Sequence, residues 1–354
     1  MPVRLIFQLL LCCLLAATTH GQDDPPPSVN LGDPAPPLRL RAWLKGVPIP
    51  QFEKGRVYVV EFWATWCHGC KIAMPHLSGL AREYRDKVTF LGIDIHEMRT
   101  TSLKKIKHFV DSMGARMDYN VAAEDSNFME AGWLDSTGEK NKGIPRSFIV
   151  DAVGRLAWVG YPWEIKQILP RIINSDWDVQ AALTQRNLQR RLEFEDKDEN
   201  FELWKFRADP DKPNDLGHPD SILSAIDRIV QKEPGLKYAP IMAYNTFSAL
   251  LKTDPHKAYT YGREVLASSF FGETPFESVV NPIEYNEKKV TIPPDIYRLA
   301  AEALELGIGQ SPYPELVDIP KTYRHMADLY RRAGDQSKAL ECQQKAGVTS
   351  SRVF

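Results

Sequence analysis

The stretch V-Y-V-V-E-F-W-A-T-W-C-H-G-C-K-I-A-M, from Val57 to Met74, decides the fold. Its first half is rich in β-branched and aromatic residues, with Glu61 in its middle, and this composition predicts a buried strand. Its second half is amphipathic and predicts a helix. Cys67 and Cys70 therefore stand where a strand passes into a helix. The first turn of a helix carries unpaired N–H groups and the positive end of the macrodipole, and both favour a thiolate over a thiol.

The spacing of the two cysteines predicts disulfide exchange. Cys67, at the helix start, is the predicted nucleophile, and Cys70 lies one helical turn away, close enough to attack a mixed disulfide formed at Cys67. The alternatives for a C-x-x-C motif are half of a zinc site and a structural disulfide. A zinc site needs two more ligands, and the chain has no second C-x-x-C and no H-x-x-x-H. We therefore expect redox chemistry, with no metal and no cofactor besides the cysteine pair.

The stretch resembles the active-site segment of the thioredoxin superfamily, in which a carboxylate and F-W-A-x-W-C-x-x-C are followed by lysine. The residues that match this pattern are Glu61, Phe62, Trp63, Ala64, Trp66, Cys67, Cys70 and Lys71. The resemblance implies an α/β thioredoxin fold with a mainly parallel central sheet and helices on both faces. Strand patterns that alternate with helix patterns as far as residue 174 point to the same arrangement.

Pro145 matches a second feature of the superfamily, a cis-proline that precedes a hairpin strand and faces the cysteines. The resemblance implies that the backbone of Ile144 is exposed there, so that a substrate chain pairs with it beside Cys67. The alternative is an ordinary trans loop proline, because only about 5% of X-Pro bonds are cis.

Glu61 lies on a strand that should be buried beneath the cysteine helix. A carboxyl group there without a cation has a raised pKa and can carry a proton to and from Cys70. Thioredoxins have Asp at the matching place, so the longer side chain leaves its reach to Cys70 open. The alternative is a structural Glu61 in an ion pair with Lys71.

Residues next to the cysteines are expected to tune the site. His68, between the two cysteines, is predicted to stabilise the Cys67 thiolate, and the alternative is a solvated loop histidine of little effect. Trp66 is assigned to the hydrophobic rim of the site. Lys71 follows the second cysteine, as in the superfamily pattern.

The N-terminal region predicts export. Residues 1–21 contain one arginine, an apolar core and then small residues, which is the layout of a secretory signal peptide with cleavage before Gln22. Residues 22–37 are rich in proline and are expected to form an extended linker. The protein is therefore expected in the periplasm or cell envelope. Beyond the leader, the one cysteine outside the pair is Cys342, interpreted as a buried small hydrophobe.

The segment G-D-P-A-P before the first strand resembles the start of the peroxiredoxin and TlpA-like branch, called the AhpC/TSA-redoxin branch. Peroxiredoxins use P-x-x-x-[ST]-x-x-C, which requires proline at Val60 for a reactive Cys67, or at Trp63 for a reactive Cys70. Neither position holds the required proline. The resemblance therefore points to exported TlpA-like or ResA-like oxidoreductases, with a thioredoxin-like redox domain over residues 38–174.

The rest of the chain reads as helical. Residues 175–218 are expected to form a charged helical linker, and residues 219–354 an all-α domain. The end of this domain resembles one tetratricopeptide repeat (TPR), through Tyr323, Met326, Ala327, Tyr330, Gly334, Asp335, Ala339 and Ala346. No constant period precedes it, so an irregular helical bundle is the alternative to a TPR-like solenoid.

The net charge and the motifs are compatible with three classes of function. Lys+Arg 44 against Asp+Glu 46 gives a formal charge of -2, which provides no basic field for nucleic acid. The preferred function is an exported thiol-disulfide oxidoreductase that acts on protein thiols and disulfides, has a membrane redox partner, and docks proteins through its helical domain. The alternatives are a non-catalytic scaffold with a thioredoxin-like adaptor and a thiol peroxidase, which the missing proline disfavours.

Overall fold

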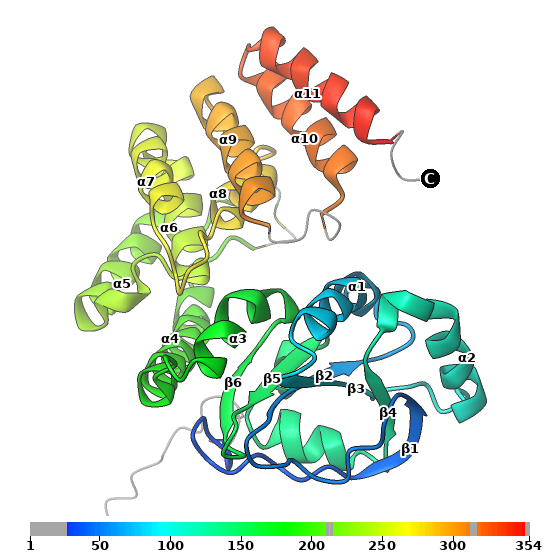
Figure 1. Ribbon diagram of the computed structural model, residues 1–354. Helices are drawn as coiled ribbons and strands as arrows, with labels where there is room; N and C mark the ends of the chain where they lie inside the picture. Colours follow the sequence, from blue (N-terminus) through cyan, green and yellow to red (C-terminus); the bar gives the residue numbers. More distant parts are fainter. Residues whose placement is uncertain (1–26, 210–211, 213–214, 312–316, 351–354) are drawn as a thin grey trace, which may run out of the picture.

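The computed structural model describes residues 27–209, 212, 215–311 and 317–350 (Figure 1). The predicted signal peptide, residues 1–21, lies outside these residues, as does the first part of the proline-rich linker. In the described ranges, no helix combines the length and the apolar character that a membrane span requires.

The first half of the described chain contains a 6-stranded sheet with strand order β1-β4-β3-β2-β5-β6. The strands are β1 Leu40–Lys45, β2 Val57–Trp63, β3 Val88–Asp94, β4 Asn120–Glu124, β5 Arg146–Val150 and β6 Leu156–Gly160. Strands β2, β3 and β4 run parallel, whereas β1, β5 and β6 are antiparallel to their neighbours. The expected thioredoxin fold is confirmed, with a mixed sheet whose parallel part is confined to its centre.

Strand β2 lies at the centre of this half because both of its faces are apolar. Val57, Val59 and Trp63 enter the core beneath the helices α1, α2 and α3, while Tyr58, Val60 and Phe62 enter the core on the opposite face. The three helices are α1 His68–Glu83, α2 Leu103–Met113 and α3 Ile165–Ile173. The opposite face is covered by the helical turn Glu130–Asp135, by segments before β2 and by the beginning of α4 (Val179–Trp204).

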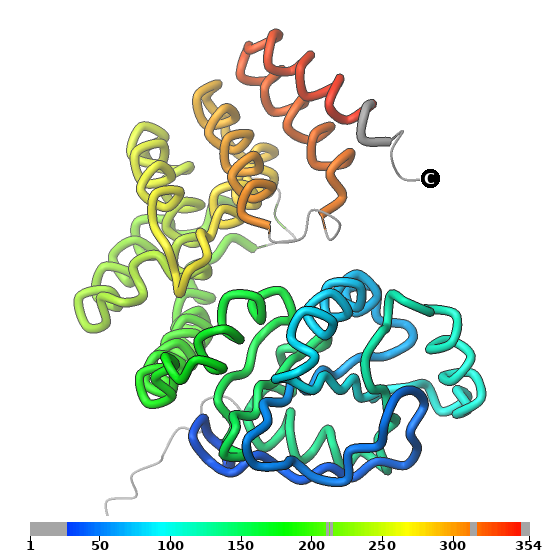
Figure 2. Tube along the Cα trace, in the orientation of Figure 1, coloured from blue at the N-terminus to red at the C-terminus, as the bar shows by residue number. Residues whose placement is uncertain are grey.

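The second half is helical, and α4 joins it to the half that contains the sheet (Figure 2). Its helices are α5 Pro219–Lys232, α6 Pro240–Thr253, α7 Pro255–Ala267, α8 Glu277–Asn286, α9 Pro294–Gln310, α10 Ile319–Arg332 and α11 Gln336–Ser350. The sequence patterns indicate each of these except α8, whose Pro282 and short length weaken the helical signal. Helices α10 and α11 form a pair across a turn at Gly334, which has a φ of 77°.

Helix α4 occupies much of residues 175–218, for which the sequence predicts a charged helical linker. Its 26 residues form one continuous helix. Near its start, Val179 and Leu183 pack against the sheet core, and further along, Leu192 and Leu203 enter a core shared with α5 and α6. The charged composition concealed these apolar positions, because their low density gives little amphipathic signal. Helix α4 therefore belongs to both halves.

Candidate functional site

The cysteine pair lies between the end of β2 and the first turn of α1, as predicted. Cys67 and Cys70 are joined by a disulfide, with their Cα atoms 5.3 Å apart. Cys67 caps the N-terminus of α1, and its sulfur accepts a hydrogen bond from the backbone N–H of Cys70 at 3.1 Å. The backbone N–H of Cys70 in this first turn is thus directed at the Cys67 sulfur, which favours the thiolate form of Cys67 after reduction.

Both cysteines of the pair are buried. Cys67 is only 5% exposed and Cys70 is fully buried. Trp66, beside them, is 51% exposed, and its indole N–H donates to the carbonyl of His96 at 2.9 Å. Of the two cysteines, Cys67 is therefore the one that keeps some contact with solvent, and it lies next to an exposed tryptophan.

The backbone of Ile144 lies beside the reactive sulfur. The Ile144–Pro145 peptide bond is cis, as expected, and the trans alternative is wrong. The carbonyl oxygen of Ile144 is 3.6 Å from the sulfur of Cys67. Sequence positions 67 and 144 are thus brought together, while the pairing of a substrate chain with Ile144 stays a prediction.

Glu61 is buried beneath the cysteine helix. It is 2% exposed, and the hydroxyl of Ser147 donates to one of its carboxyl oxygens at 3.5 Å. Burial raises its pKa well above the usual range, and the Ser147 hydroxyl acts in the opposite direction. Lys71 is exposed and lies over the Phe109 ring, 5.7 Å from its centroid. Among the described residues no ion pair joins Lys71 to Glu61, which leaves the structural alternative unsupported.

A second group of carboxyls beside the site was missed by the sequence analysis. Glu97 accepts a hydrogen bond from the backbone N–H of Thr65 at 2.6 Å, two residues before Cys67. Asp94, at the end of β3, is 3% exposed. Burial raises its pKa to about 9, and the nearby charge of Glu97 adds to this effect. The available signal was the acidic segment that follows β3, because the ends of neighbouring parallel strands lie at one edge of a sheet.

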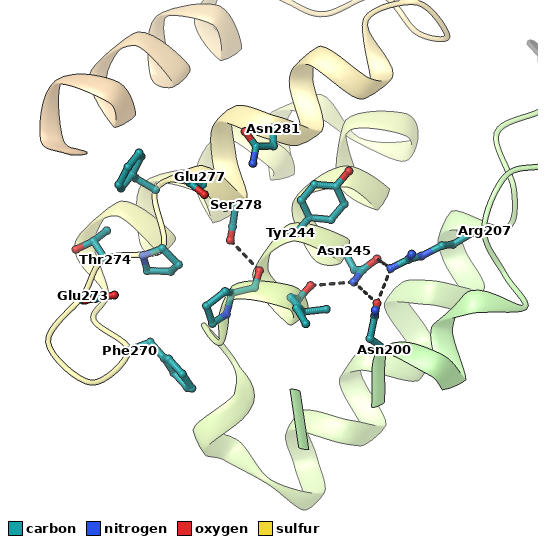
Figure 3. Close-up of a pocket in the computed structure, with 14 residues that line it drawn as sticks. Asn200, Arg207, Tyr244, Asn245, Phe270, Glu273, Thr274, Glu277, Ser278 and Asn281 are labelled. Carbon is teal, nitrogen blue, oxygen red and sulfur yellow. Dashed lines mark hydrogen bonds between the residues drawn. The ribbon is translucent and has the colours of Figure 1, made fainter. Parts of the chain in front are cut away.

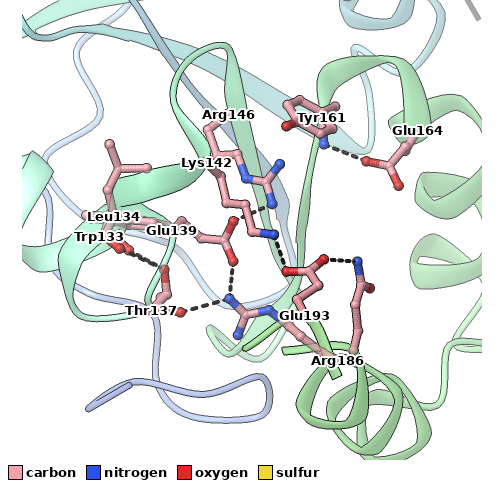
Figure 4. Close-up of polar contacts among 11 residues, drawn as sticks. Trp133, Leu134, Thr137, Glu139, Lys142, Arg146, Tyr161, Glu164, Arg186 and Glu193 are labelled. Atoms are coloured by element: carbon pink, nitrogen blue, oxygen red, sulfur yellow. Dashed lines mark hydrogen bonds and ion pairs between the residues drawn. The ribbon is translucent and has the colours of Figure 1, made fainter. Parts of the chain in front are cut away.

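A third cluster, also missed, links the residue after Pro145 to α4 (Figure 4). The carboxylate of Glu139 is 3% exposed and forms ion pairs with both Arg146 and Arg186. Arg146 also stacks over the Tyr161 ring at 4.5 Å, and Lys142 pairs with Glu193 at 2.5 Å. Because these residues come from segments that are far apart along the chain, no local motif could indicate them. They fix α4 next to β5, the strand that begins directly after the cis-proline.

Two cavities lie in the helical half or at its border with the redox half. One, of about 560 Å³, lies within that half (Figure 3), where Arg207 donates hydrogen bonds to Asn200 and Asn245. Another, of about 570 Å³, lies between the two halves and is bordered by Arg146 on one side and by Phe270 on the other. In the part of the chain that the structure describes, no cluster of histidine, cysteine and carboxylate ligands is arranged to hold a metal ion.

Comparison with known proteins shows which family the chain belongs to. The Thioredoxin family model matches residues 51–110, which contain the cysteine pair. Protein FixW of Rhizobium leguminosarum is 30% identical over 160 residues, which cover 42% of this chain and 69% of FixW. The chain belongs to the thioredoxin family.

Other relatives of this thioredoxin family member are named for thiol-disulfide chemistry. The thiol:disulfide interchange protein HelX of Rhodobacter capsulatus is 27% identical over 132 residues, 37% of this chain and 67% of HelX. The crystal structure of a thiol:disulfide interchange protein from Chlorobium tepidum TLS has 24% identity and a TM-score of 0.32, over 40% of this chain and 96% of that one. With the Cys67–Cys70 pair in place, this thioredoxin family member is a thiol-disulfide oxidoreductase.

Proposed function

We propose that the protein is an exported thiol-disulfide oxidoreductase that exchanges disulfides with protein substrates through Cys67 and Cys70. The observation that carries the proposal is the position of the pair, with Cys67 at the N-terminus of α1 and 3.6 Å from the carbonyl of Ile144. This position supports a stabilised thiolate next to a backbone segment that can align a polypeptide.

In the reductive direction, the Cys67 thiolate attacks a substrate disulfide. A bond forms between Cys67 and one substrate sulfur, and the other substrate sulfur leaves as a thiolate. Cys70 then gives its proton to Glu61 and attacks the Cys67 sulfur. The second substrate sulfur leaves, the Cys67–Cys70 disulfide forms, and two electrons have passed to the substrate. The oxidative direction is the reverse, and the potential of the partner decides which one operates.

The remaining parts of the protein are given supporting roles. Residues 1–21 direct export and are removed before Gln22. The helical half, with its TPR-like α10 and α11, positions protein partners, and a membrane protein exchanges electrons with the pair. The cavity of about 560 Å³ in the helical half supports a docking role. The redox domain is assigned to residues 38–174, and α4 joins it to the helical domain.

Insulin reduction by dithiothreitol tests the proposal. We expect the protein to accelerate precipitation of the insulin B chain and Cys67→Ser to abolish the acceleration. Cys70→Ser is expected to react once and stop as a mixed disulfide, because the resolving sulfur is absent. Cys342→Ser is the matched control, since Cys342 is buried in the helical half, and it should retain the activity. A wild-type protein without effect on insulin would support the non-catalytic scaffold instead.

A further inference from the structure

The cavity of about 560 Å³ in the helical half has an arginine at one end (Figure 3). Arg207 is half-buried, and its Nη2 donates hydrogen bonds to the side-chain oxygens of Asn200 and Asn245. The guanidinium also lies 5.2 Å from the centroid of the Trp204 ring. Neutral amides and an aromatic ring thus fix its orientation, and no carboxylate of the described residues pairs with it. A guanidinium held in place without a counter-ion is a preorganised site for an anion.

The same end of the cavity carries unused hydrogen-bond donors. Among the described residues, Nε and Nη1 of Arg207, Nδ2 of Asn200 and the hydroxyl of Tyr244 have no hydrogen-bond partner. A guanidinium and an amide nitrogen only donate, and a phenol can donate, so these groups together complement a group that only accepts. A carboxylate is such a group, and arginine binds carboxylates through two parallel hydrogen bonds.

Further cations lie close to Arg207. Burial lowers the pKa of Lys252, and the charges of Lys289 and Arg207 lower it further, while the charge of Asp215 acts in the opposite direction. The carboxylate of Asp215 already accepts hydrogen bonds from two backbone N–H groups. Three cations therefore stand against one engaged carboxylate, and the field at this end of the cavity favours a negatively charged ligand.

The opposite end of the cavity is acidic. Glu273 and Glu277 border the cavity there (Figure 3), both are exposed, and neither forms an ion pair within the described ranges. Burial raises the pKa of Glu164, which belongs to the redox half, and the charge of Glu273 adds to this effect. Glu273 therefore lies near the redox half without a cationic partner, and a basic group beside it would be stabilised.

This cavity shares a wall with the cavity of about 570 Å³ between the two halves. Pro240, Ile241, Phe270 and Glu273 border both cavities. Arg207 borders only the cavity within the helical half, and the second cavity extends to the residue that follows the cis-proline. The two cavities therefore lie side by side, with Arg207 at the end that is farther from the redox half.

We propose that the cavity within the helical half binds the C-terminal end of a partner polypeptide, with the terminal carboxylate on Arg207 and a basic side chain beside Glu273. The carboxylate meets the unused donors, and the apolar walls formed by Ile241 and Phe270 cover the chain between the two charged ends. A chain end fits this position because a polypeptide that comes from the redox half reaches Arg207 last. The inference rests on the proposed function and names the chemistry of the partner.

Fluorescence anisotropy tests the site with a labelled, lysine-containing peptide that has a free C-terminal carboxylate. We expect the Kd of this peptide to be about tenfold lower than that of the same peptide with an amidated C-terminus, because the amide cannot form a charge-assisted pair with Arg207. In Arg207→Gln the two peptides should bind equally, at the weaker level. Arg228→Gln is the matched control, since Arg228 is exposed on α5 and borders neither cavity, and it should keep the tenfold preference.

The acidic end is tested by replacing the lysine of the peptide with norleucine. The wild type should bind the lysine peptide more tightly, by about fivefold, as expected for one ion pair at a partly exposed site. Glu273→Gln should remove this preference and keep the preference for the free carboxylate. A loss of both preferences in Glu273→Gln would contradict the assignment of the two ends to separate charges.

The remaining outcomes separate the docking site from the redox chemistry. Equal affinity of the wild type for the free acid and for the amidated peptide would overturn the inference, and this comparison does not depend on the folding of a variant. An amidated peptide that ends in glutamine but carries an internal glutamate, and binds as tightly as the free acid, would overturn the assignment to a chain end. A wild-type protein that prefers the free acid but does not reduce insulin would overturn the proposed function and support the docking site.

Discussion

The two halves of the molecule bury different kinds of polar group. The redox half buries the carboxyls of Glu61, Asp94 and Glu139. The buried polar groups of the helical half are mostly neutral, such as Asn245 and Asn286, whose side-chain amides donate to the carbonyl of Ile241 at 2.8 Å and to the hydroxyl of Ser248 at 2.9 Å. Asp196 of α4 is a buried carboxylate on this side, and it accepts hydrogen bonds from two backbone N–H groups. Neutral hydrogen bonds tie helices together at little cost, whereas buried charge is expensive unless it is paired or serves chemistry. The buried carboxyls of the redox half accordingly have either cationic partners, as Glu139 has, or a raised pKa, as Glu61 and Asp94 have.

The largest expected effect is at Glu139, a buried carboxylate with a structural role. Its two arginine partners, Arg146 and Arg186, would be left unpaired in Glu139→Gln. We expect the free energy of unfolding to fall by about 3–5 kcal/mol, as is typical when one partner of a buried ion pair is removed. Urea denaturation measures the loss. The exposed pair Lys107–Asp111 supplies the control, since Lys107→Ala should cost no more than about 0.5 kcal/mol.

Asp94 tests the same comparison through the dependence of folding stability on pH. Its pKa is about 9 in the folded protein against 3.8 for an ordinary aspartate. Between these values the folded chain holds a proton that the unfolded chain releases, so the contribution of Asp94 to stability is greatest below pH 4 and is lost as the pH rises towards 9. Asp94→Asn removes this dependence.

We expect the stability of Asp94→Asn relative to the wild type to increase with pH, by up to about 1.4 kcal/mol for each unit. Denaturant titrations at pH 6 and pH 8 measure this difference. Equal differences at the two pH values would mean that Asp94 is ionised in the folded protein, contrary to the comparison.

Asp196, on α4, provides the smallest expected effect. Its carboxylate accepts hydrogen bonds from the backbone N–H groups of Ile241 and Met242, each at 2.9 Å, and so caps the start of α6. We expect Asp196→Ala to lower stability by about 1–2 kcal/mol, the usual value of a lost N-cap. Insulin reduction should stay within about twofold of the wild type. A larger loss of activity would show that the helical half takes part in the exchange reaction itself.

The redox half was predictable because its signals are local. A central strand that is apolar on both faces, a C-x-x-C at its end and Pro145 further on are each contained in a few residues. The positions of Cys67, Cys70 and Glu61 followed from them. The exposure of Cys67 did not, because it depends on the backbone of Ile144, which lies far away in sequence.

The helical half was less predictable for a physical reason. Helix positions follow from a 3.6-residue period, and the helical character of residues 219–354 was predicted from it. Which helices contact one another depends on packing between distant segments, as in the capping of α6 by Asp196. Likewise, Glu97 and Glu139 acquire their roles only through Thr65 and Arg186, which are remote from them along the chain.

Helix α4 makes the two halves thermodynamically interdependent. Because Leu183 belongs to the sheet core and Leu203 to the helical core, melting of this helix removes contacts from both. Unfolding of either half is thereby coupled to unfolding of the other, and we expect the two halves to unfold together rather than independently. By mass action, a partner that binds the helical half also protects the cysteine pair from local opening.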